Sequence, residues 1–110
     1  MRLLLAATLA LWGTVCFAQE EVGTIAGAGW VSCGEYAQSF QENPEGAERY
    51  FFAWAQGYMS GVNQASTVRK NLRGWSLAKQ KDHIRAFCDK RPLAHYGEAV
   101  QSVFGSLPDR

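Results

Sequence analysis

Three cysteines and two histidines are the residues of this 110-residue chain best suited to covalent or metal chemistry. Cys16 lies in an apolar N-terminal run, which leaves Cys33 and Cys88 as a pair separated by 88 − 33 = 55 residues. A cysteine pair in a short exported chain most often forms a disulfide, and a loop of this length adds about 4 kcal/mol of stability. The alternative is a reactive thiol with His83 as its base, but His83 stands five positions before Cys88, off its helical face.

Neither metal binding nor acid–base catalysis fits the spacing of the remaining polar residues. His83 and His95 are twelve positions apart in different expected helices, without cysteines or carboxylates at metal-ligand spacing. No phosphate loop or nucleotide fingerprint occurs, and the serine of residues 57–61 (GYMSG) stands in the wrong place for a nucleophile elbow. Several glutamates stand at expected helix starts, where they suit the dipole: Glu35, Glu42, Glu45 and Glu48. We predict a non-enzyme with no catalytic residue, cofactor or metal.

The first eighteen residues, MRLLLAATLALWGTVCFA, resemble a secretory signal peptide cleaved after Ala18. The apolar run from Leu3 to Val15 is shorter than the roughly 20 residues of a membrane span, which argues against an uncleaved anchor. Lipid attachment at Cys16 is a further alternative, although Val15 is a poor residue before a lipidated cysteine. Cleavage leaves 110 − 18 = 92 residues, one small domain with no stable membrane insertion.

The charge of the mature chain is balanced. Loss of Arg2 leaves 11 − 1 = 10 basic residues against 10 acidic ones, so the formal charge is zero before histidines and termini are counted. This balance gives no reason to expect nucleic acid or an anionic membrane as a partner. It does predict a strong response to acid, because protonated carboxylates would leave the basic residues uncompensated.

The stretch 48–66, ERYFFAWAQGYMSGVNQAS, is the helix around which the domain is expected to form. Its apolar arc covers more than half of the circumference at about 100° per residue, more than an ordinary surface helix needs. Four residues are expected to pack against another helix: Trp54, Gly57, Tyr58 and Gly61. The surplus of the arc is expected to contact another protein, or a second copy in a homodimer, through Phe51, Phe52 and Met59.

Three further helices complete an all-α, four-helix domain closed by one disulfide. The first is expected over 30–41, with Ser32 as an N-cap, and the central helix starts at Asn43-Pro44. The third follows Ser76, and the last runs from Pro92 to Leu107. Residues 19–29 form an expected flexible leader, so the helical domain is predicted to span 30–110.

The connection over 67–75, TVRKNLRGW, has two interpretations. It could grip an acidic partner through Arg69, Lys70, Arg73 and Trp75. Alternatively, it is a solvated loop whose tryptophan packs back on the core.

Several short motifs together resemble a known family: Cys33, Glu35 and Tyr36; Trp54; and Phe87, Cys88, Asp89 and Pro92. They are similar to the HdeA/HdeB class of small periplasmic helical proteins. They are closer still to a group of uncharacterised exported bacterial proteins, whose shared segments correspond to residues 32–34, 54–63 and 87–93 of this chain. The resemblance covers about 31–107. It implies a periplasmic location and a single Cys33–Cys88 disulfide that ties the first helix to the third. It also implies an acid-activated chaperone that offers apolar surface to unfolding clients.

A second resemblance in overall plan, to Tai-type immunity proteins, implies binding and blocking of a secreted toxin. That group tends to have a cysteine where this chain has Gln56. Either resemblance predicts a protein-binding domain. A carrier of a small apolar ligand is the remaining alternative, for which no polar anchor converges on a pocket.

Overall fold

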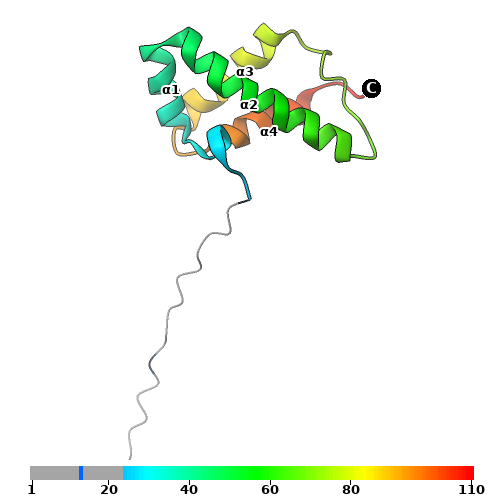
Figure 1. Ribbon diagram of the computed structural model, residues 1–110, viewed down its shortest axis with the longest axis horizontal. Helices are drawn as coiled ribbons and strands as arrows, with labels where there is room; N and C mark the ends of the chain where they lie inside the picture. Colours follow the sequence, from blue (N-terminus) through cyan, green and yellow to red (C-terminus); the bar gives the residue numbers. More distant parts are fainter. Residues whose placement is uncertain (1–12, 14–23) are drawn as a thin grey trace, which may run out of the picture.

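The computed structural model describes Gly13 and residues 24–110, which form a helical domain (Figure 1). A short 3₁₀ helix, η1 (Gly27–Trp30), precedes four α-helices: α1 (Cys33–Glu42), α2 (Pro44–Ala65), α3 (Leu77–Lys90) and α4 (Tyr96–Ser106). The described part of the chain forms no strand, only two isolated bridges. The predicted all-α, four-helix class is therefore confirmed. The expected signal peptide, 1–18, lies outside the described residues apart from Gly13.

Three helix starts follow the local sequence signals. Ser32, Asn43 and Ser76 cap α1, α2 and α3, and each side-chain oxygen accepts a hydrogen bond at 3.1 Å from the backbone N–H three residues on. These caps satisfy amides that have no partner inside the helix. Since Asn43 alone separates α1 from α2, the chain must turn back sharply there, and the two helices pack together.

The last helix begins later than predicted. It starts at Tyr96 instead of Pro92, and Leu93, expected on its apolar stripe, is 93% exposed. The backbone before α4 is instead paired with the segment before α1, where the Cys33 N–H donates to the Ala94 carbonyl at 2.7 Å. A backbone hydrogen bond between segments far apart in the chain thus replaces an early helical turn.

The prediction of a flexible leader over 19–29 is wrong for the last residues of that range. Ala28 and Gly29 are buried in η1, which packs against α2 and α4. Because Gly29 has no side chain, the indole of Trp54 lies directly against its backbone, where a Cβ atom would overlap the ring. The Trp54 Nε1–H also donates to the Ala26 carbonyl at 3.0 Å. The folded domain therefore begins before Trp30.

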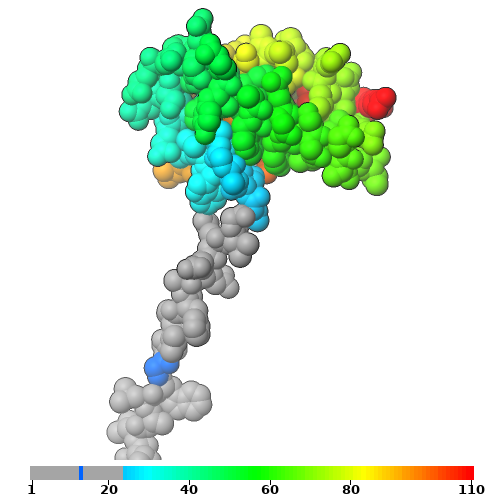
Figure 2. All heavy atoms as spheres, in the orientation of Figure 1, coloured from blue at the N-terminus to red at the C-terminus, as the bar shows by residue number. Residues whose placement is uncertain are grey.

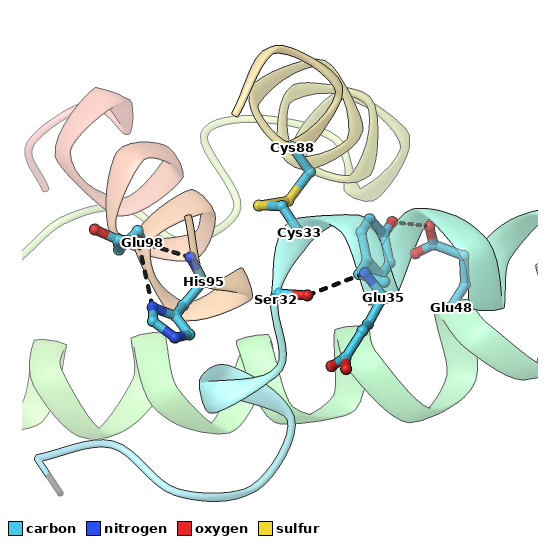
Figure 3. The surroundings of a disulfide bond; sticks show 8 residues. Ser32, Cys33, Glu35, Glu48, Cys88, His95 and Glu98 are labelled. Carbon is cyan, nitrogen blue, oxygen red and sulfur yellow. Dashed lines mark hydrogen bonds and ion pairs between the residues drawn. A yellow bond between two sulfur atoms is a disulfide. The ribbon is translucent and has the colours of Figure 1, made fainter. Parts of the chain in front are cut away.

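The core is a layer of aromatic rings beside the disulfide. Tyr36 of α1, Phe51 of α2 and Tyr96 of α4 lie with their ring centroids 4.9–5.0 Å apart. The predicted disulfide between Cys33 and Cys88 is confirmed, with Cα atoms 4.7 Å apart, and it joins the start of α1 to the end of α3 (Figure 3). None of the described helices is both long enough and apolar enough to cross a bilayer.

Two buried tyrosines predict a loss of stability at high pH. Burial raises the pKa of the Tyr96 phenol, and burial with a hydrogen bond to Glu48 raises that of Tyr36. Both stay neutral in the folded protein where the unfolded chain ionises, so their stabilising contribution is present below the ordinary value of 10.0 and is lost above it. We expect the unfolding free energy to fall above about pH 10, by up to about 1.4 kcal/mol per pH unit for each phenol.

Urea unfolding of the purified protein at about pH 9 and about pH 11 measures this fall. The double variant Tyr36→Phe/Tyr96→Phe is the matched control, because it keeps the lysines that also titrate in this range. A fall of equal size in both proteins would contradict the assignment of the effect to the two phenols.

Candidate functional site

A groove runs along one side of α2, between this helix and the start of α3. It consists of two open hollows with volumes of about 720 Å³ and about 630 Å³. Both are lined by Gln56 of α2 and Leu77 of α3, so the two hollows adjoin each other at these residues. In Figure 2 the green surface of α2 meets the yellow surface of α3 and the yellow-green connection before it.

One stripe of α2 provides the long wall of the groove. Glu45, Phe52, Gln56 and Met59 stand at intervals of seven, four and three positions, which places them on one helix face. Their neighbours on α2 that also line the groove are Pro44, Glu48, Arg49, Ala53 and Ser60. From Glu45 to Ser60 this stripe is about 22 Å long at the rise of an α-helix. The site is therefore elongated and open along its length.

The floor of the groove is apolar. Phe52 and Met59 line it, although their side chains are only 4% and 2% exposed and belong mainly to the core. The structure thus brings two of the three contacts predicted for the apolar arc, Phe52 and Met59, to the site. Phe51 is not among the lining residues, since it packs against Tyr36 and Tyr96 in the interior, so its predicted partner contact is wrong for the folded state.

Across the second hollow from α2 lies the end of the connection over 66–76, which is held in place by a residue that sequence reasoning missed. Gln80 is buried, and its Nε2–H₂ group donates to the carbonyls of Leu72 and Trp75 at 2.9 and 3.0 Å. These bonds fix Trp75 and Arg73 beside the groove. Gln80 gave no signal in the sequence because it stands among the polar residues of α3.

Basic side chains surround the groove. Arg49 and Lys81 line one hollow and Arg73 the other, and none of the three makes an ion pair within the described residues. Lys79 is similarly unpaired, and its Nζ lies 4.0 Å from the centroid of a Trp75 ring. The site is therefore apolar at its floor and mainly positive at its edges.

The other two predicted contact residues of the connection lie elsewhere. Lys70 pairs with Asp109 at 3.1 Å, and the carbonyl of Arg69 accepts a hydrogen bond from the Arg110 N–H at 2.9 Å. Both residues therefore hold the C-terminal segment and line neither hollow of the groove. The basic loop thus divides into an anchoring part and a groove part.

Glu48 joins three helices beneath one end of the groove. Its Oε1 accepts from the Tyr36 hydroxyl at 2.8 Å and from Arg85 Nη1 at 2.9 Å. Arg85 also pairs with Asp82. Burial lowers the pKa of Arg85, but the hydrogen bond and charge of Glu48 outweigh burial and raise it overall. Glu48 is therefore a cross-link between α1, α2 and α3, a role that its place near the start of α2 did not reveal.

The predicted helix-packing residues separate into two pairs. Trp54 and Tyr58 do pack against other helices. The Trp54 ring centroid lies 6.3 Å from that of Tyr96 of α4, and the Tyr58 hydroxyl accepts a hydrogen bond from Gln101 of α4 at 3.1 Å. Gly57 and Gly61 are exposed, and a Cβ at either position would meet nothing within 4 Å. Within one copy, therefore, no other helix approaches either glycine closely, and the predicted packing role is not fulfilled there.

This arrangement predicts opposite effects of alanine at different glycines. Gly57→Ala and Gly61→Ala are each expected to raise the unfolding free energy by about 0.5–1 kcal/mol, because alanine is the better helix former and has room. Gly29→Ala is expected to lower it by about 1–3 kcal/mol through overlap with Trp54. Urea unfolding measures all three, and destabilisation by Gly57→Ala would contradict the exposed position.

The homodimer stays a prediction. If a second copy covers this face, sedimentation would show weaker association of the alanine variants.

The two histidines have structural neighbours. His83 Nε2 is hydrogen-bonded to Ser102 Oγ at 2.9 Å, and the His95 ring stacks on Trp30 with centroids 4.3 Å apart. At the start of α4, Glu98 accepts from the His95 backbone N–H at 2.7 Å (Figure 3). Among residues 24–110, no three His, Cys, Asp or Glu side chains gather closely enough to hold a metal ion.

The fold and the site together define a small, disulfide-closed, four-helix domain with an open groove beside its longest helix. Comparison with protein-family models, curated proteins and solved structures found no match to this chain.

Proposed function

We propose that this protein is an exported, non-enzymatic protein-binding domain whose groove receives a segment of another protein. The observation that carries the proposal is the groove itself, because Phe52 and Met59 form its floor while Arg49, Lys81 and Arg73 at its edges make no ion pair within the described residues. Apolar contacts supply affinity in such an interface, and charged edges supply specificity and association rate. The disulfide agrees with the proposed export to the periplasm, since intracellular thiols are mostly kept reduced.

The shape of the groove favours a protein partner over a small ligand. Small-molecule sites enclose most of the ligand and place a few polar groups around it. Here the groove is open and elongated. Within the described structure, one buried side-chain polar atom has no hydrogen-bond partner, the Tyr96 hydroxyl, and Tyr96 does not line the groove. We therefore rank the small-ligand carrier last.

Leu77 provides the direct test, because it lies where the two hollows meet and is 52% exposed. A random peptide library displayed on phage would be selected on the wild-type protein, and the enriched peptides measured against Leu77→Asp. We expect Leu77→Asp to weaken binding at least about tenfold, since a charge would enter an apolar contact. Leu93→Asp is the matched control, because Leu93 is 93% exposed and lines neither hollow. Equal binding by both variants, or no enrichment, would contradict the proposal.

The Glu48 cross-link favours an acid-activated chaperone as a second candidate. Protonation of Glu48 and Asp82 at low pH would weaken their bonds to Arg85, and that of Glu48 would also weaken its bond to Tyr36. Movement of α2 away from α1 and α3, which the disulfide keeps together, would then expose the apolar residues that the fold buries: Phe51, Phe52 and Met59.

Fluorescence of a dye for apolar surface, and a client aggregation assay, at about pH 3 and about pH 7 would test this candidate. A chaperone of this kind gains binding only in acid, whereas an immunity-type protein that uses the folded groove binds one partner at neutral pH. Glu48→Gln removes the charge at neutral pH, so a chaperone should show part of its dye binding there. No gain of dye binding or protection in acid would rule this candidate out.

A further inference from the structure

The geometry points to the partner class of this groove: an amphipathic α-helix with acidic flanks that lies alongside α2. This inference rests on the proposed protein-binding function and deepens it. Three properties of the groove carry it, namely the absence of a strand edge in its walls, the spacing of its floor residues and the sign of its edge charges.

The walls of the groove favour a helix over an extended segment. They are formed by helices and a connection, and the described residues contain no strand. The isolated bridges, Ser32 with His95 and Lys70 with Asp109, involve no groove-lining residue. An extended peptide would therefore find no strand edge to pair with, and its backbone N–H and C=O groups that face the apolar floor would lack partners, whereas a helix satisfies them internally.

The floor sets the spacing of the apolar residues on the partner. Phe52 and Met59 are seven positions apart on α2, which corresponds to two helical turns and about 10.5 Å. A helix lying alongside α2 meets both with apolar residues at i and i+7. A residue at i+3 or i+4 then lies over Gln56 and Leu77, where the hollows join.

The charges at the edges of the groove indicate that the partner carries negative charge. Arg49 and Lys81 stand at one hollow, and Arg73 with the adjacent Lys79 stands at the other, so cations are present along the whole groove. Glu45 opposes them at one end, while Glu48 is already bound to Arg85. Carboxylates on both sides of the partner's apolar stripe would find cations within reach, and because these charges are at the surface, binding should weaken with salt.

Three synthetic 18-residue peptides test the inference by fluorescence anisotropy with the wild-type protein. The first has an apolar stripe at i, i+3, i+7 and i+11 with glutamates on its flanks. The second replaces the glutamates with lysines, and the third keeps them but has two central prolines that prevent a helix. We expect the first peptide to bind at least about tenfold more tightly than either of the others, with affinity falling as salt rises.

Charge reversal at the groove sharpens the test. Lys81→Glu/Arg73→Glu should bind the glutamate peptide at least about tenfold more weakly than wild type and the lysine peptide more tightly than wild type does. Lys90→Glu is the matched control, because Lys90 lines neither hollow of the groove, and it should leave both affinities unchanged within about twofold. Circular dichroism melting would confirm that each variant is folded.

The outcomes separate this inference from the proposed function. Tight binding of the proline peptide would overturn the helical partner, and equal binding of the glutamate and lysine peptides would overturn the acidic one. In either case the proposed groove function stands. Failure of the glutamate peptide alone, with Leu77-dependent binders recovered from the random library, also overturns only the inference. Failure of every peptide together with an empty library selection overturns both.

Discussion

Removal of the disulfide by Cys33→Ala/Cys88→Ala is expected to lower the unfolding free energy by about 4 kcal/mol. The bond closes a 55-residue loop, and its loss returns that conformational freedom to the unfolded chain. Most small domains have 5–15 kcal/mol of stability, so the loss is a large fraction of the total. It would also remove the covalent link between the start of α1 and the end of α3, which would leave packing, the Glu48 cross-link and the backbone hydrogen bonds to the segment after α3 to hold them together.

Guanidinium unfolding of the oxidised protein, the reduced protein and the double variant would measure the effect. Both sulfur atoms belong to fully buried residues, so alanine also removes packing volume. The reduced wild-type protein is the matched control, because it opens the loop and keeps both side chains. We expect it to lose most of the same stability. A reduced protein that unfolds at the same denaturant concentration as the oxidised one would show that the loop closure contributes little.

Glu48→Ala is expected to lower the unfolding free energy by about 2 kcal/mol. The Glu48 side chain is 14% exposed and accepts from both Tyr36 and Arg85. Its removal leaves the Tyr36 hydroxyl without this acceptor and a partly buried guanidinium paired only with the exposed Asp82. Loss of one member of a fully buried ion pair costs about 3–5 kcal/mol. The smaller value is expected here because Arg85 is 28% exposed and water can reach it.

Glu45→Ala is the control for Glu48→Ala. Glu45 stands in the first turn of the same helix, is exposed and makes no ion pair within the described residues, so we expect a change below about 0.5 kcal/mol. The double variant Glu48→Met/Arg85→Met removes both charges and should lose less stability than Glu48→Ala, since no uncompensated charge remains. Equal effects of Glu48→Ala and Glu45→Ala would show that the cross-link does not stabilise the fold.

The apolar arc of α2 shows how far the candidate site could be predicted. Its width correctly indicated a helix with more apolar surface than one neighbour covers, and Phe52 and Met59 do reach the groove. Phe51 could not be separated from them, because a helical wheel gives the angle of a residue but not the element opposite it. The glycines show the same limit: Gly57 and Gly61 had the spacing for close packing, yet the close approach occurs at Gly29.

The sequence by itself determined the helical class, three of the helix starts and the cysteine pair. These features depend on contacts between residues a few positions apart, such as Ser32 with Glu35, or on the small number of cysteines available to pair. Only the tertiary structure decided the start of α4, the burial of η1 and the groove. Each depends on which surfaces meet across a long separation, as in the 37-residue interval between Glu48 and Arg85, and no local pattern encodes that choice.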